Sequence, residues 1–271
     1  MSTITINHMN IYYEQYGRPI HEAEDVLVLI HGYLSSSFSF RFLIPYLQEE
    51  HAVLSIDLPG FGQSDKALHF NYSLHNYGRL VLDILERFEI QRAILIGHSM
   101  GGQIALQAGL QEPNRIKKIV GLAAAGYMGP VKRSLVWLSY LPFFSWGLKV
   151  YFTKKDIMEN FLAVIHNRTI INEEMVEGYL KPLQTKAFYR SLVLLMRHRE
   201  GDLSTARVRE ITQPVLLIWG EQDSIVPLAV GKRFAKELSA ADLQVLKQTG
   251  HLLPEEKPKE TALLIKAFIK Q

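Results

Sequence analysis

Short apolar runs alternate with longer helical patterns along most of this 271-residue chain, and this alternation limits the folds that it can adopt. The runs are rich in Val, Ile and Leu, as strands buried on both faces are. Strands separated by helix-length segments are typical of an α/β fold, with a mostly parallel sheet and helices on both faces. The predicted core strands are Val26–Ile30, Ala52–Ile56, Ala93–Ile96, Ile119–Leu122, Val215–Trp219 and Leu243–Leu246.

Further patterns predict local structure around these strands. An apolar alternation near the N-terminus indicates an antiparallel hairpin that contains Ile4, Ile6, Ile11 and Tyr13. Apolar residues keep helical spacing between Ser73 and Phe88, and Ser73 can cap the start of that helix. A second helix should begin directly after Ser99.

The alternation stops between residues 126 and 210, where helical patterns dominate. We therefore expect a core formed by residues 1–125 and 211–271, with residues 126–210 inserted as a helical cap. The expected cap holds 13 Lys and Arg residues and 8 Asp and Glu residues, so its net charge is +5 while the rest of the chain carries −2.

One short part of the expected cap is rich in aromatic residues. We interpret these rings mainly as cap core or pocket wall, and a surface that contacts a membrane transiently is the alternative. The rings belong to Trp137, Tyr140, Phe143, Phe144, Trp146, Tyr151 and Phe152.

Composition excludes several classes of protein. The chain has no cysteine, which rules out disulfides, thiolate catalysis and cysteine-based metal sites. A formal net charge of +3 without a basic cluster argues against a nucleic-acid partner, and the scattered histidines predict no metal or organic cofactor. The N-terminus lacks the features of a secretory signal, which predicts a cytoplasmic protein. Ser134–Leu148, a stretch with neither charged residues nor histidine, is too short to span a membrane.

The pentapeptide Gly97-His98-Ser99-Met100-Gly101 follows a predicted strand and precedes a helical pattern. Gly-x-Ser-x-Gly in this position is typical of a nucleophile elbow, a turn so tight that small residues must flank the serine. Ser99 is therefore the candidate nucleophile.

A serine nucleophile needs a base within hydrogen-bond reach and a carboxylate that orients the base. Asp223 and His251 each follow a predicted strand, at the sheet edge where parallel strands place their sites. We assign Asp223 as the acid and His251 as the base. His98 is a rival base, but its side chain should point away from that of Ser99, so we assign it to packing or a polar network.

A tetrahedral intermediate requires backbone N–H donors directed at its oxyanion. One should be the N–H of Met100, at the start of the helix after the elbow. The other should come from the loop that begins at His31, where Tyr33 is favoured over Leu34. Gly32 allows the loop to turn into the pocket, and His31 is expected to hydrogen-bond the loop rather than transfer protons.

Taken together, the motifs resemble those of the α/β-hydrolase superfamily over nearly the whole chain. The resemblance supports the N-terminal hairpin and the inserted cap, and it implies a structural role for the loop 57–64. Dehalogenases and epoxide hydrolases of this fold use aspartate at the elbow, so Ser99 disfavours both. The motifs are His31-Gly32, residues 57–64, residues 97–102, residues 220–223 with Val226-Pro227, and Gly250-His251.

The predicted function is hydrolysis of a carboxylic ester, as a small-molecule substrate, through an acyl-enzyme on Ser99. The aromatic and aliphatic cap with basic flanks predicts a hydrophobic acyl group, such as that of a monoacylglycerol or a medium-chain ester. The candidate substrate contacts are His31, Leu34, Trp137, Tyr140, Phe143 and Phe144.

Two other functions stay open. A carbon–carbon bond hydrolase acting on a vinylogous diketone would need cations for a substrate carboxylate, which Arg190, Arg197 and Arg199 could supply, although a solvated helical face is the simpler interpretation. A signalling or ligand-binding protein could also keep the triad and act through a partner.

Overall fold

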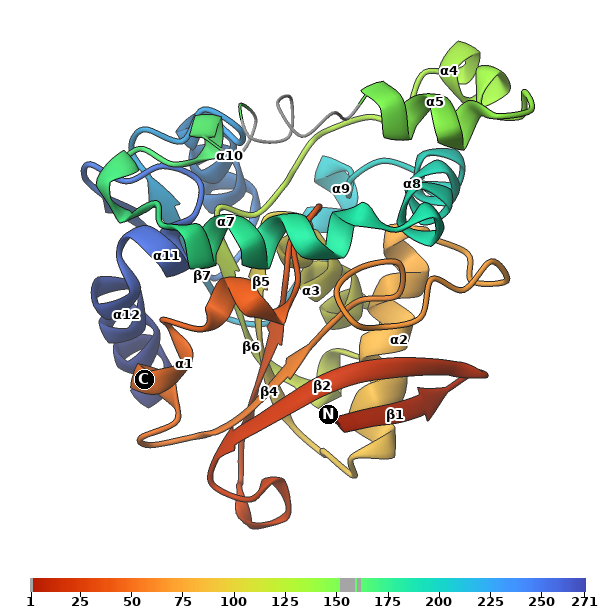
Figure 1. Cartoon of the computed structure of the whole chain (residues 1–271). Helices are drawn as coiled ribbons and strands as arrows, with labels where there is room; N and C mark the ends of the chain where they lie inside the picture. Colours follow the sequence, from red (N-terminus) through yellow and green to blue (C-terminus); the bar gives the residue numbers. More distant parts are fainter. Residues whose placement is uncertain (1, 152–158, 160–161) are drawn as a thin grey trace.

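A computed structural model of the chain describes residues 2–151, 159 and 162–271 (Figure 1). Eight strands form one sheet in the order β1-β2-β4-β3-β5-β6-β7-β8. β1 pairs antiparallel with β2, β2 pairs antiparallel with β4, and the other five pairs are parallel, so the sheet is mostly parallel, as predicted. The strands are β1 (Ser2–Ile6), β2 (Met9–Gly17), β3 (Val26–Ile30), β4 (Ala52–Ile56), β5 (Ala93–His98), β6 (Ile116–Leu122), β7 (Val215–Gly220) and β8 (Ala241–Leu246).

All six predicted core strands are present, and some are longer than predicted. β6 begins at Ile116, three residues before the predicted start at Ile119. The prediction began too late because Lys117 and Lys118 interrupt the apolar run of this strand. The Lys118 side chain is nevertheless buried, and its ammonium donates to the carbonyl oxygens of Phe268 and Ile269 at 2.7 and 3.1 Å. These carbonyls lie in the last turn of the C-terminal helix, where a cation is favourable.

The predicted N-terminal hairpin is present, with Ile4 paired to Ile11 and Ile6 paired to Met9. Asn7 and His8 form its two-residue turn, with φ angles of 48° and 62°. Positive φ at both turn positions gives the backbone twist that suits a tight hairpin.

Helices cover both faces of the sheet: α1 and α12 lie together on one face, and α2 and α3 pack against each other on the opposite face (Figure 1). Ser73 caps α2 as predicted, because its hydroxyl accepts the N–H of Asn76 at 3.1 Å. The core helices are α1 (Ile44–Leu47), α2 (Leu74–Arg87), α3 (Met100–Gln111), α10 (Leu228–Glu237), α11 (Leu253–Glu256) and α12 (Pro258–Lys270).

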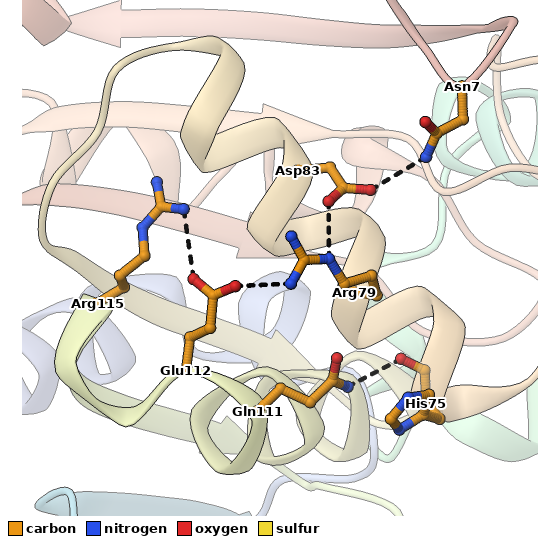
Figure 2. A network of polar contacts seen from close by, with 7 residues as sticks. All are labelled: Asn7, His75, Arg79, Asp83, Gln111, Glu112 and Arg115. Carbon is orange, nitrogen blue, oxygen red and sulfur yellow. Dashed lines mark hydrogen bonds and ion pairs between the residues drawn. The ribbon is translucent and has the colours of Figure 1, made fainter.

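A polar network joins α2 to the end of α3 and to the N-terminal hairpin (Figure 2). Arg79 donates to Asp83 at 2.9 Å and to Glu112 at 2.7 Å. Asp83 also accepts the side-chain amide of Asn7 at 3.1 Å, and Glu112 pairs with Arg115 at 3.4 Å. These contacts hold α2 against the C-terminal end of α3, the helix that begins directly after Ser99.

Between β6 and β7, the described residues form helices and loops without any strand. We call residues 126–210 the helical segment; its exact limits stay a prediction. The described part of the segment lies over the end of the sheet at which β5 and β7 finish (Figure 1). In the part of the chain that the structure covers, no helix is both long and apolar enough to cross a bilayer. The helices of the segment are α4 (Arg133–Leu138), α5 (Phe144–Tyr151), α7 (Glu173–Leu180), α8 (Lys186–His198) and α9 (Thr205–Arg209).

Candidate active site

Ser99 occupies a sharp turn between β5 and α3. Its φ and ψ angles are 52° and −117°, a conformation that costs a residue with a side chain on the order of 1–3 kcal/mol. Hydrogen bonds hold the turn: the Ser99 N–H donates to Leu122 O, and the Ser99 carbonyl accepts the N–H groups of Gly102 and Ala125, each at 2.9 Å. The strand and the helix therefore present this serine in a fixed orientation.

The glycines on both sides of Ser99 are required by close backbone approach. A Cβ on Gly97 would lie 2.2 Å from the carbonyl oxygen of Gly101. A Cβ on Gly101 would lie 2.1 Å from the carbonyl oxygen of Ile30, in the neighbouring strand β3. Real Cβ contacts are much longer, so any side chain at either position would open the turn.

His251 and Asp223 lie together, although 28 residues separate them in the sequence. Nδ1 of His251 is 2.8 Å from Oδ2 of Asp223, and both side chains are buried. The other carboxylate oxygen accepts the N–H groups of Ile225 and Val226, both at 2.9 Å. Because Nδ1–H donates to the carboxylate, Nε2 of His251 is left free to accept a proton.

His98 supports the loop that carries His251. Its Nε2 lies 2.9 Å from the carbonyl oxygen of His251, to which it donates, and the two rings are 4.8 Å apart. Burial, together with the neighbouring His251, lowers the pKa of His98 from 6.5 to about 3. His98 is thus neutral in the folded protein, in a polar network as expected from its place in the elbow.

The loop after β3 passes directly beside the nucleophile. A Cβ on Gly32 would lie 3.0 Å from Cβ of Ser99. The N–H groups of Tyr33 and Met100 make no hydrogen bond to any described residue, so both are free to act as oxyanion donors. Leu34 adopts a positive φ of 56°, which turns the chain away after the loop. A role for these donors stays a prediction.

His31 is fully buried, and backbone groups use both of its ring nitrogens. Nε2 accepts the N–H of Leu58 at 2.9 Å, so Nδ1 carries the proton and donates to the carbonyl oxygen of Gly32 at 2.8 Å. Burial lowers the pKa of His31. The buried carboxylate of Asp57 also accepts two backbone N–H groups. Both residues hold loops beneath the site, and a substrate contact by His31 stays a prediction.

The aromatic cluster of the helical segment is mostly exposed and does not form the expected cap core. Trp137, Tyr140 and Phe143 are 76%, 63% and 80% exposed. Phe143 and Phe144 line a separate hollow of about 330 Å³ between α5 and α8. No described contact brings these rings to the elbow, so their substrate role stays a prediction. Phe152, in the same cluster, lies outside the described residues.

The three arginines considered for a substrate carboxylate are placed differently from one another. Arg199 is paired with Asp202 at 2.6 Å. Arg197 stacks over Tyr140, with its Cζ atom 3.9 Å from the ring centroid, and donates to a backbone carbonyl. Arg190 is exposed and lines the hollow between α5 and α8. Among the described residues, no group of three or more histidines and carboxylates is arranged to hold a metal ion.

Glu256 is a site residue that the sequence did not reveal. One carboxylate oxygen accepts the N–H of Gly250, next to His251, at 2.9 Å. The other accepts the N–H groups of His166 and Asn167 in the helical segment, at 3.0 and 2.9 Å. A single buried carboxylate thus joins the loop of the base to the segment that covers it.

Two further hydrogen bonds connect the site to the same stretch of the helical segment. The N–H of His251 donates to the carbonyl oxygen of Val164 at 2.9 Å. The hydroxyl of Ser224, next to the candidate acid, donates to the carbonyl oxygen of Ala163 at 3.0 Å. Both site loops are therefore bound to residues 163–167.

Comparison with known proteins agrees with the sheet and the elbow. A family model described as alpha/beta hydrolase fold matches residues 25–258. The chain belongs to the alpha/beta hydrolase family. The match covers strands β3 to β8, the elbow and both site loops, and it supports hydrolase chemistry without naming the bond that is cleaved.

Relatives of this alpha/beta hydrolase differ in how far their activity is known. The chain is 42% identical over 266 residues to the Bacillus subtilis (strain 168) protein called uncharacterized hydrolase YugF, covering 98% of this chain and 96% of the relative. It is 26% identical to a 2-hydroxymuconate semialdehyde hydrolase of Pseudomonas sp. (strain CF600), covering 90% and 86%. The structure of a meta-cleavage product hydrolase from Pseudomonas fluorescens IP01 shares the fold, with a TM-score of 0.80, 21% identity and coverage of 100% and 97%.

Proposed function

We propose that this alpha/beta hydrolase cleaves carboxylic esters through an acyl-enzyme on Ser99. The observation that carries the proposal is the 2.8 Å contact of His251 with Asp223, together with the strained elbow that holds Ser99. The carboxylate fixes the imidazole tautomer that carries its proton on Nδ1, so the unprotonated Nε2 can act as the general base.

In the proposed reaction, the hydroxyl oxygen of Ser99 attacks the ester carbonyl carbon while its proton passes to Nε2 of His251. The N–H groups of Met100 and Tyr33 stabilise the oxyanion. The carbon–oxygen bond to the alcohol then breaks, and the alcohol leaves with the proton from His251. A water molecule then attacks the acyl carbon while His251 takes its proton. His251 returns the proton to the Ser99 oxygen as the carbon–oxygen bond to Ser99 breaks, which releases the carboxylic acid.

A carbon–carbon bond hydrolase is the second candidate. It is favoured by the 26% identity to a 2-hydroxymuconate semialdehyde hydrolase. Such a substrate carries a carboxylate, which calls for a cation near the nucleophile. Arg197 and Arg199 are already engaged by other groups, and Arg190 lines a separate hollow, so ester cleavage is the better-supported proposal.

The test is turnover of p-nitrophenyl esters from acetate to palmitate by the wild type and by Ser99→Ala, purified identically. We expect serine-dependent hydrolysis with a maximum at a medium or long acyl chain, and a loss on the order of a million-fold in kcat for the variant. Equal activity of the variant would refute the assigned nucleophile. Faster serine-dependent turnover of a ring-fission product than of any ester would instead support carbon–carbon cleavage.

A further inference from the structure

An aromatic and aliphatic surface is exposed on α4, α5 and the turn between them. Trp146 is 64% exposed, and Trp137, Tyr140 and Phe143 are exposed as described above. Monomeric proteins rarely expose a contiguous apolar surface of this kind without an interaction partner. We call this surface the α4–α5 face; it consists of Leu135, Trp137, Leu138, Tyr140, Leu141, Phe143, Trp146 and Val150.

The charges around the α4–α5 face have one sign. The sequence has no acidic residue between Glu112 and Asp156. Lys132 and Arg133 are exposed at the start of α4, and Lys149 is exposed on α5. Along the sequence, the charged residues nearest to the apolar rings are therefore all cations, which complements an anionic surface.

We propose that the α4–α5 face binds the surface of a lipid bilayer that contains anionic lipids. Trp and Tyr are favoured where hydrocarbon meets lipid headgroups, because each ring is apolar with one polar group. Lysine and arginine beside an anionic leaflet each add to the binding. α4 and α5 project outward from the body of the protein, so a flat surface can reach them (Figure 1).

Chemistry favours a bilayer over a second copy or a protein partner. In a symmetric dimer, each α4–α5 face would meet the same face of its partner and bring like charges together. The centres of protein interfaces are also depleted of lysine, whereas short interfacial helices combine aromatic rings with Lys and Arg. The hollow that Phe143 and the exposed Arg190 line offers room for an anionic headgroup.

Intrinsic fluorescence offers a direct measurement. The chain has three tryptophans, of which Trp219 is fully buried while Trp137 and Trp146 lie on the α4–α5 face. Vesicles of phosphatidylcholine mixed with phosphatidylglycerol are expected to shift the emission to the blue and to carry the protein in flotation. Phosphatidylcholine vesicles alone are expected to bind it much more weakly. The measurement needs no substrate, so its outcome is independent of the proposed ester hydrolysis.

Charge variants test the electrostatic part of the proposal. Each basic side chain near an anionic leaflet contributes roughly fivefold to binding, so the triple variant Lys132→Gln/Arg133→Gln/Lys149→Gln is expected to lose on the order of a hundredfold in affinity. Unchanged affinity of a folded triple variant, or equal binding to both kinds of vesicle, would overturn the proposal.

A second variant pair tests the apolar part. Trp137→Ser/Trp146→Ser is expected to lose vesicle binding at least tenfold, roughly the effect of removing two interfacial aromatic rings. Leu263→Ser, which changes an exposed apolar residue on α12, is the matched control and is expected to bind like the wild type. A concentration-dependent dimer that the tryptophan variant abolishes, with no binding to either vesicle, would assign the face to a second copy instead.

Discussion

The candidate active site and the α4–α5 face differ in how far contacts inside the protein occupy their side chains. At the site, Asp223 and His251 are buried, and protein hydrogen bonds occupy both carboxylate oxygens. On the α4–α5 face, large apolar rings such as Trp137 and Phe143 are mostly exposed. Contacts inside the protein preorganise the first region, whereas the apolar side chains of the second are exposed and available to a binding partner.

The difference teaches where a substitution acts. A change at the site disturbs a closed set of hydrogen bonds and alters chemistry or folding. A change on the α4–α5 face removes contacts that the folded chain does not make with itself. The following predictions test this contrast, from the largest expected effect to the smallest.

Asp223→Asn is expected to lower kcat roughly ten-thousandfold, because an amide no longer holds the imidazole in the tautomer that leaves Nε2 free. The amide oxygen can still accept the N–H groups of Ile225 and Val226, so the loop is expected to fold normally. Ester turnover with circular dichroism provides the measurement. Glu221→Gln, exposed on the same loop, is the control, and a comparable loss there would contradict the assignment.

Acid is expected to destabilise the protein through His98. Its pKa is about 3 when folded and 6.5 in the unfolded chain, so between these values the unfolded state binds more protons. Stability is then lost as pH falls below 6.5, by up to about 1.4 kcal/mol per pH unit. Urea unfolding across this window measures the slope. His98→Gln keeps a donor for the His251 carbonyl but does not titrate, so it is expected to reduce the dependence of stability on pH. An unchanged slope would contradict the role of His98.

Glu256→Gln is expected to reduce the free energy of unfolding by about 1.5–3 kcal/mol, the worth of hydrogen bonds to a charged group. The amide group of glutamine would face N–H donors of Gly250 or of residues 166–167, which it cannot satisfy. Chemical denaturation measures the loss. Glu260→Gln, which removes an exposed charge on α12, should change stability by less than about 0.5 kcal/mol.

A pair of glycine substitutions compares the two regions directly. Gly101→Ala places a Cβ 2.1 Å from a backbone oxygen and is expected to cost about 1–3 kcal/mol, more than the gain in helix propensity. Gly147→Ala on α5 meets nothing within 4 Å and is expected to stabilise the protein by up to about 1 kcal/mol. Thermal unfolding of both variants distinguishes them, and similar shifts would contradict the contrast.

Most of the sheet could be predicted, because buried parallel strands read as unbroken apolar runs. β6 shows the limit, because the lysine at position 118 interrupts the apolar run and the first three residues of the strand were not predicted. The burial of Lys118 depends on carbonyl groups near the other end of the chain, which the local pattern does not reveal. The aromatic cluster shows another limit. A stretch rich in aromatic residues has the same sequence pattern whether another helix covers it or not, so the exposure of Trp137 could not be predicted from the sequence.

The candidate site was predictable where chain order alone places residues together. Asp223 and His251 follow strands that end at the same edge of the sheet, and the structure brings them within 2.8 Å. Glu256 was missed because its partners at His166 and Asn167 lie 90 and 89 residues earlier, in a segment without strand order to guide the prediction. Nothing in its local pattern beyond an acidic first turn of α11 distinguishes it.

The hydrogen bonds from residues 163–167 to both site loops make the position of the helical segment and the geometry of the base interdependent. Thermodynamic linkage is reciprocal: whatever shifts the segment changes the affinity of the site by a given factor, and occupancy of the site changes the affinity of the segment for its own ligand by the same factor. A surface that binds α4 and α5 would then act as an effector of the reaction, and a bound substrate analogue would alter how tightly the protein holds that surface.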